Sequence, residues 1–155
     1  MTADNSAIST AARHIREAKT GALGTLLPGG QPCVTFVSVA ATGAGEPLFL
    51  LSNLALHTRN IKGDPRVSLL LRESDVPEEG NDPLTGSRLT LVGTIARMDS
   101  AEARERYLST HPEASDYANF SDFAFYAMTI ESGHLVAGFG RIVEIDGAEL
   151  RAQFR

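Results

Sequence analysis

Residues 34–53 read VTFVSVAATGAGEPLFLLSN, and this stretch decides the fold class. Residues 34–40 are rich in β-branched side chains and partly alternate between apolar and polar positions, which is typical of a half-buried strand. Residues 42–47 contain two glycines and a proline, so we expect a loop there. Residues 48–51 (LFLL) are too few for a helix and too apolar for a surface, which predicts a buried strand. The stretch therefore indicates antiparallel β-structure.

Similar patterns occur along the rest of the chain. We expect further strands at 22–27, 66–71, 88–98, 123–130 and 134–145, with turns at 28–30, 131–133 and 146–147. Helices are predicted at 6–19, at 54–62 with Ser52 or Asn53 as the cap, and from a capping box of Asp99 and Glu102 to Thr110, with a helical turn at 113–117. Residues 73–87 are acidic and rich in glycine and proline, which predicts an exposed, mobile loop. Six or seven strands with short helices between them predict a mainly β (α+β) domain, an antiparallel barrel with flanking helices.

Length and composition limit the class of protein. The chain has 155 residues, which predicts a single domain over 1–155, and 43% hydrophobic and 21% charged residues are ordinary for a folded protein. Fourteen Lys and Arg against 19 Asp and Glu give a formal charge of −5, which opposes nucleic-acid binding by bulk charge. Cys33 is the only cysteine, which favours a reducing compartment, and no apolar run could form a signal peptide or span a bilayer. We therefore expect a cytoplasmic protein without a membrane or nucleic-acid partner.

Residues 50–61 form the most informative segment for function. A buried strand leads there into a helix whose start carries Ser52, His57, Thr58 and Arg59. Backbone N–H groups at a helix start, two hydroxyls and a guanidinium are the groups that hold a phosphate. The alternative is that Ser52 or Asn53 only caps the helix and that the other side chains are solvated.

Several other kinds of site lack their motif. The four histidines, at 14, 57, 111 and 134, have no metal-pair spacing, so we expect no metal site. The glycines at 133, 138 and 140 do not complete a dinucleotide fingerprint, and neither a Walker A motif nor a G-x-S-x-G elbow is present. Cys33 is expected to be inert. Six aromatic residues between Tyr107 and Tyr126 could flank a planar cofactor, but core packing is the more common role.

Three segments in order resemble a known family. They are LSNLALHTRNIKGDPRVSL at 51–69, DPLTGSRLTLVG at 82–93 and HLVAGFGR at 134–141. Together with the strand pattern over about residues 9–145, they resemble the pyridoxamine 5′-phosphate oxidase-like FMN-binding split barrels, most closely the haem-utilisation branch. The resemblance implies a six-stranded split barrel that forms a homodimer with FMN in grooves at the interface. It also implies a flavoprotein oxidoreductase with a small-molecule substrate that the sequence does not identify.

The resemblance also implies the residues that would bind the cofactor. The strand containing Thr35, Ser38 and Val39 would run beside the flavin, with Ser38 as a hydrogen-bonding group. Phosphate binding would fall to Ser52, His57, Thr58 and Arg59. Arg88 would approach the flavin ring or, in haem-binding relatives, the haem pocket. No residue is assigned a catalytic role.

Two alternatives stay open beside FMN binding. The first is a haem-binding or haem-degrading protein on the same barrel, with His134 or His57 as candidate iron ligands. The second is a cofactor-free regulatory domain that uses the loop at 73–87 as a contact surface. Pyridoxamine phosphate oxidation is disfavoured because the oxidase's Arg and Lys positions align with Thr35 and Ala40, and because its C-terminal Arg-x-His segment is missing. The late histidine with which many haem-degrading relatives ligate iron is also absent after His134.

Overall fold

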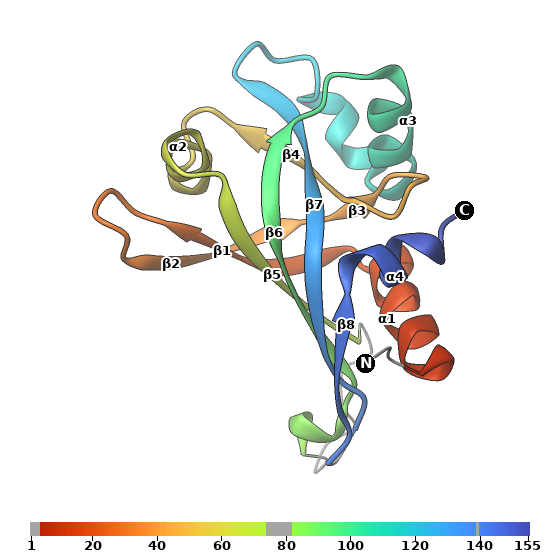
Figure 1. Cartoon of the computed structure of the whole chain (residues 1–155). Coiled ribbons are helices and arrows are strands. Elements are labelled where there is room, and N and C mark those ends of the chain that lie inside the picture. The colour runs from red at the N-terminus through yellow and green to blue at the C-terminus, as the bar shows by residue number, and fades with distance from the viewer. Residues whose placement is uncertain (1–3, 74–81, 139) are drawn as a thin grey trace.

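The computed structural model describes residues 4–73, 82–138 and 140–155, and it shows one strongly curled antiparallel sheet with helices at its ends and on one side (Figure 1). The strands are β1 (Thr20–Leu26), β2 (Pro32–Ser38), β3 (Ala40–Ala41), β4 (Pro47–Ser52), β5 (Arg66–Arg72), β6 (Arg88–Arg97), β7 (Phe123–Val136) and β8 (Ile142–Asp146). The helices are α1 (Asn5–Glu17), α2 (Leu56–Gly63), α3 (Ala101–Thr110) and α4 (Gly147–Ala152), with 3₁₀ turns at Pro83–Thr85 and Pro112–Asp116. Most of the expected loop at 73–87 lies outside the described residues.

The sheet forms a half-barrel with the strand order β2-β1-β5-β6-β7-β4-β3, and β8 pairs with β7. The mainly β class with flanking helices is confirmed, but the described chain has eight strands in this sheet rather than six. The two-residue strand β3 and the short strand β8 were not expected as separate strands.

The turn predicted at Glu131–Gly133 is wrong, because β7 runs through it for 14 residues. The pairing of β6 with β7 instead shifts between Val92 and Gly93, which accommodates an extra residue as a β-bulge. The chain reverses later, around Gly138 and Gly140, whose φ angles of 124° and 74° favour glycine. Turn-forming residue types therefore marked a bulge and not a turn.

Local capping motifs also gave wrong helix starts. Ser100, not Asp99, caps α3 by accepting a hydrogen bond from the backbone N–H of Ala103. At α2 the cap position is Ala55, without a side-chain hydrogen bond. The tight turn predicted at 146–147 is instead the start of α4, where Asp146 accepts from the N–H of Ala148.

The core has two parts. Inward-facing leucines of the half-barrel, such as Leu23, Leu69 and Leu89, pack with Phe49 of β4 and with the alanine-rich face of α1. A smaller cluster beneath α3 contains Tyr107, Leu48, Leu50 and Phe125. The second cluster brings α3 against the edge of the sheet that carries β4 and β3.

One face of the sheet is not covered. Direct cross-strand pairs place Phe36, Ala22, Leu70, Thr90 and His134 in one row on this face, and the row beside it contains Val34, Gly24, Ser68, Val92 and Ser132. We call these ten residues the outer face. The apolar side chains in it are exposed, Phe36 to 77% and Val34 to 70%. Exposed apolar surface that runs over several strands is unusual for a monomer.

Buried His14 on α1 should make stability depend on pH. Its Nε2 lies 2.7 Å from the Ser87 hydroxyl, and burial lowers the pKa of the imidazole, with a further lowering by Arg13 that Glu73 and Glu17 oppose. The unfolded state therefore binds a proton at about pH 6.5 while the folded state still excludes it. We expect the free energy of unfolding to be unaffected by this group above that pH and to fall below it, by at most about 1.4 kcal/mol per pH unit.

Urea unfolding between pH 7.5 and 5 measures this effect. In the His14→Gln variant, the free energy of unfolding should fall less steeply with decreasing pH below pH 6.5, because this one proton no longer contributes. His57→Gln should also reduce the steepness of this fall, because burial lowers the pKa of His57 as well. An unchanged slope in His14→Gln would contradict the assignment.

Candidate functional site

A groove opens where β2, β4, α2 and α3 approach one another. It has a volume of about 350 Å³, and residues of all four elements, of the segment before β7 and of the first position of β7 line it. Its lining is Phe36, Val37, Ser38, Leu50, Leu51, Ser52, Ala55, His57, Tyr107, Tyr117 and Phe123. We call it the His57 groove. Four aromatic rings and a few polar groups suit a flat, largely apolar ligand with polar ends.

His57 is the imidazole of this groove. Its Nδ1 lies 2.9 Å from the hydroxyl of Thr35 on β2, and this hydrogen bond leaves Nε2 as the nitrogen that can meet a ligand. Burial lowers the pKa of His57, so the ring is neutral at pH 7. A neutral imidazole with a fixed orientation can accept a hydrogen bond or donate an electron pair to a metal.

Hydrogen bonds hold α2 and the segment before it in place, and two of them join residues far apart in the sequence. The backbone N–H of Asn53 donates to the carbonyl of Asp122 at 2.7 Å, and Ser52 accepts from the N–H of Leu54 at 3.1 Å. On the other side of α2, the buried Asn60 amide donates to Thr25 of β1 at 3.0 Å. His57 is the second residue of α2, and these bonds place it beside β2.

The floor of the groove belongs to α3. Burial raises the pKa of Tyr107 to about 12, and a hydrogen bond with Ser38 opposes this rise, so the phenol stays protonated at physiological pH. His111 lies one turn further along, and its Nε2 is 2.8 Å from the carbonyl of Val39. Tyr107 and His111 thus hold the end of β2 in place.

The structure brings together only some of the predicted cofactor residues. Ser38, Ser52 and His57 line the His57 groove, and Thr35 contacts it through His57. Val39 is buried and does not line it. The convergence of these residues from β2, β4 and α2 could not be derived from their spacing alone.

The remaining predicted residues lie elsewhere. Thr58 is fully buried, and its hydroxyl has no hydrogen-bond partner among the described residues. Arg59 is exposed and outside the lining of the groove. Arg88 begins β6, where it faces Arg72 on β5 and donates to the carbonyls of Leu84 and Gly86. Thr58, Arg59 and Arg88 therefore do not meet at the His57 groove.

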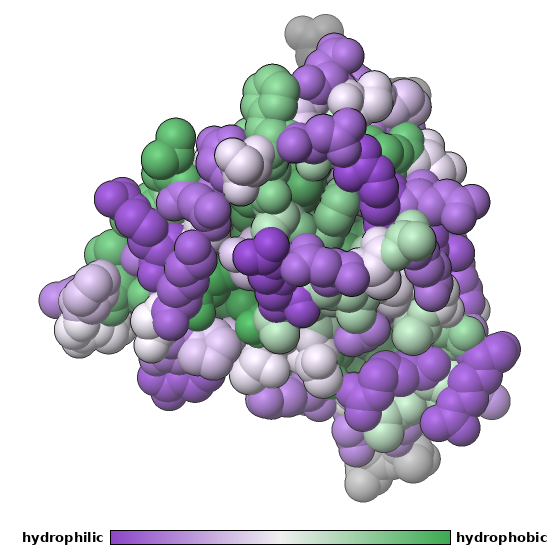
Figure 2. Space-filling model, turned by 90° about the horizontal axis from the view of Figure 1, so that it is seen from above, coloured by the Kyte–Doolittle hydropathy of each residue, from purple (hydrophilic) through white to green (hydrophobic). Residues whose placement is uncertain are grey.

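Sequence reasoning missed the aromatic walls of the groove. Tyr107, Tyr117 and Phe123 belong to the aromatic segment that was expected to pack in the core, and Phe36 stands on the strand proposed beside the cofactor. Tyr107 does pack in the core, against Phe125, while it also lines the groove. Seen from the end that carries α2 and α3, apolar side chains are exposed among hydrophilic ones (Figure 2).

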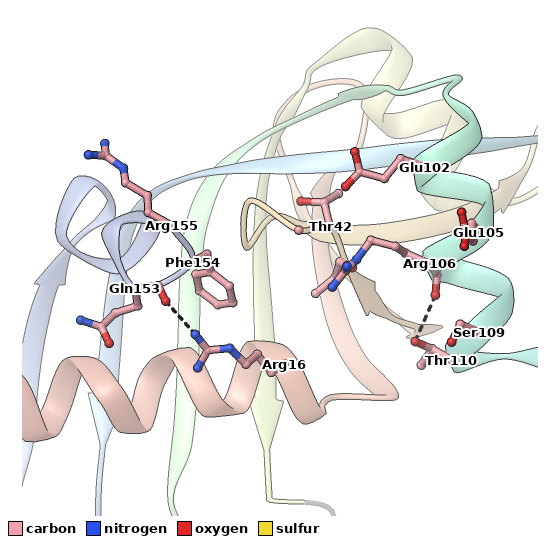
Figure 3. A pocket seen from close by; sticks show the side chains of 12 residues that line it. Arg16, Thr42, Glu102, Glu105, Arg106, Ser109, Thr110, Gln153, Phe154 and Arg155 are labelled. Atoms are coloured by element: carbon pink, nitrogen blue, oxygen red, sulfur yellow. Dashed lines mark hydrogen bonds between the residues drawn. The ribbon is translucent and has the colours of Figure 1, made fainter.

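A second hollow lies on the other side of α3. It has a volume of about 700 Å³ between the end of α1, the β3–β4 turn, α3 and the C-terminal residues. Arg16, Arg106, Glu102 and Glu105 lie in its lining, and Figure 3 shows Arg16 and Arg106 on facing walls. We call it the polar cleft.

Other kinds of site find no support in the described part of the chain. No group of three or more His, Cys, Asp or Glu side chains there could hold a metal ion. Within the same residues, no helix is long and apolar enough to cross a membrane.

Comparison with known proteins places the chain in a family. The family model described as "CREG, beta-barrel" matches residues 2–151. The chain belongs to the CREG β-barrel family. Its curled sheet is the β-barrel of that description, and the match covers the elements from α1 into α4.

Two curated relatives of this CREG β-barrel chain are named heme oxygenases. The chloroplast heme oxygenase HOZ of Arabidopsis thaliana is 33% identical over 112 residues, which are 70% of this chain and 33% of HOZ. Heme oxygenase HutZ of Vibrio cholerae is 28% identical over 145 residues, which are 87% of this chain and 78% of HutZ. The chain therefore spans about a third of the length of HOZ.

A solved structure is similar over nearly the whole chain. The heme binding protein from Mycobacterium smegmatis matches with a TM-score of 0.87 and 30% identity, covering 97% of this chain and 62% of that protein. Each of these three relatives is named for heme, and none for FMN. The comparisons thus favour the haem alternative over the FMN interpretation.

Proposed function

We propose that this protein binds haem in the His57 groove and belongs functionally with the haem oxygenases. Support comes from three relatives named for heme and from a groove whose walls are aromatic. The observation that carries the proposal is the neutral, half-buried imidazole of His57, which Thr35 orients in a groove lined by four aromatic rings.

The lining residues fit the chemistry of haem. The apolar faces of a porphyrin would lie between Phe36, Tyr117 and Phe123, which exclude water from them. The hydroxyl of Ser38 would donate a hydrogen bond to a carboxylate of the ligand, whereas the hydroxyl of Ser52 donates to the Asp122 carboxylate at 3.4 Å. His57 would present Nε2 toward the iron. Bound haem would supply the one-electron and oxygen chemistry, which the protein side chains here lack.

We also propose that the protein works as a homodimer that pairs through the outer face. Its exposed apolar residues, among them Phe36, Val34 and Val92, lie beside small residues that let a second surface approach closely. Phe36 belongs to both the outer face and the His57 groove, so a second copy on that face would extend the groove wall. Arg88, which lies outside the groove of its own protomer, would reach a ligand only from the partner.

FMN is the second candidate ligand, as expected for the split-barrel superfamily. The observation in its favour is the start of α2, which has no side-chain cap and carries His57 and exposed Arg59 within its first four residues. Free backbone N–H groups at this place could take a phosphate. The reaction would then be a flavin-dependent oxidation or reduction.

Titration with hemin and with FMN, followed by absorbance, tests the proposal on three proteins. We expect wild type to give a saturable Soret band, and His57→Ala to weaken hemin binding by roughly tenfold or more, since an iron ligand and the Thr35 contact are lost. His134→Ala tests the other candidate iron ligand, because His134 contacts Glu144 on the sheet and lies in the outer face, outside the lining of the groove. Loss of the Soret band in His134→Ala with no effect in His57→Ala would move the iron ligand to the sheet. Tight FMN binding without hemin uptake would favour the second candidate.

A further inference from the structure

The polar cleft is a separate site from the His57 groove, with which it shares no lining residue. Its walls come from four parts of the chain that are distant in sequence, namely α1, the turn after β3, α3 and the C-terminal segment (Figure 3). Its volume of about 700 Å³ is in the range of small-molecule sites. The lining is mostly polar, so its ligand must be hydrophilic.

Two arginines enter the cleft already oriented. Arg16 donates from Nη2 to the carbonyl of Gln153 at 2.7 Å, and its guanidinium lies 4.4 Å from the centre of the Phe154 ring. Arg106, on the facing wall, donates from Nε to the carbonyl of Ala41 at 2.9 Å. Within the described residues neither guanidinium forms an ion pair with a carboxylate. Each therefore has several N–H donors left for an anionic group.

Two glutamates of α3 oppose a purely anionic ligand. Glu102 and Glu105 line the same cleft, and neither has an ion-pair partner in the described part of the chain. Glu102 and Arg106 both approach the turn at Gly43, since a methyl group built there would lie 3.1 Å from Oε1 of Glu102 and 3.8 Å from Nη1 of Arg106. The cleft thus offers separate positive and negative groups within the reach of one small molecule.

We infer that the polar cleft binds a small amphoteric molecule, with its carboxylate between Arg16 and Arg106 and its ammonium group at Glu102 and Glu105. A carboxylate matches the fork of N–H donors on a guanidinium, and an ammonium group donates to carboxylates. Ser109 and Thr110 line the same wall beside Arg106, and the Thr110 hydroxyl donates to the carbonyl of Arg106 at 3.2 Å, which leaves its oxygen as an acceptor. This inference does not depend on haem binding, because it uses other residues.

Three probes of equal chain length test the charge pattern. At pH 7, succinate is a dianion, 4-aminobutyrate carries one charge of each sign, and 1,4-diaminobutane is a dication. We expect 4-aminobutyrate to shift the amide NMR signals of residues 16, 42–43, 106 and 153 saturably, and to bind more tightly than either of the other probes. No saturable shift with any probe, or tighter binding of succinate or diaminobutane, would overturn the inference.

Matched variants locate the binding. Arg16→Gln and Arg106→Gln should each weaken 4-aminobutyrate binding roughly tenfold, and the double variant Glu102→Gln with Glu105→Gln should make succinate the preferred probe. Arg13→Gln is the control, since Arg13 is exposed on α1 but does not line the cleft. Melting temperatures show whether each variant is folded, and two independent arginine variants guard against local damage at Phe154. Unchanged affinity in both arginine variants would contradict the site.

Discussion

Gly93→Ala is expected to destabilise the protein by about 3 kcal/mol or more, because the backbone of β7 leaves no room for a methyl group at this residue of β6. A methyl group built on Gly93 would lie 1.9 Å from the carbonyl oxygen of Thr129 and 3.0 Å from its carbonyl carbon. Both atoms belong to the backbone, so no side chain can move aside. The pairing shifts at this point, and separating the strands would break hydrogen bonds of the bulge.

Gly133→Ala is the matched control on the same strand pair. Gly133 is also buried, but a methyl group there would meet side chains of Leu89, Leu91 and Leu150 at 3.4–3.8 Å, which is ordinary contact. We expect its free energy of unfolding to change by less than about 1 kcal/mol. Urea denaturation of both variants gives the comparison. Equal stability of the two would show that the bulge does not bring the backbones together as described.

Phe36→Asp is expected to weaken the proposed dimer by more than about a hundredfold. Phe36 is the most exposed aromatic side chain of the described residues and lies on β2 at one end of the outer face, where a charge would be buried without a partner on dimerisation. Sedimentation velocity over a range of concentrations measures the dissociation constant. The Phe36→Asp monomer should also bind hemin less tightly, since Phe36 forms a wall of the His57 groove.

Leu84→Asp serves as the control for this variant. Leu84 is an exposed apolar residue in the turn at Pro83–Thr85, outside the outer face. Its replacement should leave the dimer intact. If wild type sediments as a monomer at micromolar concentration, pairing through the outer face is wrong.

Most strands could be predicted because their patterns are local. The β-branched run of β2 and the apolar run of β4 both fall within a residue or two of the observed strands. The failures have long-range causes. Residues 131–133 continue β7 because β6 pairs with Ser132 and Gly133. The bond from Asn53 to Asp122, 69 positions further along, holds the segment before α2, which begins only at Leu56.

The site could be predicted only in part for the same reason. The run containing Ser52 and His57 pointed to a binding segment, and both residues line the groove. Thr58, in the same run, is buried because its position on α2 faces the core, which a list of residue types does not show. Tyr107 joins the groove through a contact with Ser38 across the fold, and no local pattern contains that information. The identity of the cofactor was taken from the resemblance, and the relatives named for heme favour the other ligand.

The most direct test of haem binding in the His57 groove is a hemin titration of the wild-type protein, followed in the Soret region with FMN then added as a competitor. Our account predicts saturation at one haem per chain, with a Soret band shifted from that of free hemin and unaffected by excess FMN. A titration without a saturable Soret change, or release of haem by FMN at comparable concentration, would contradict it.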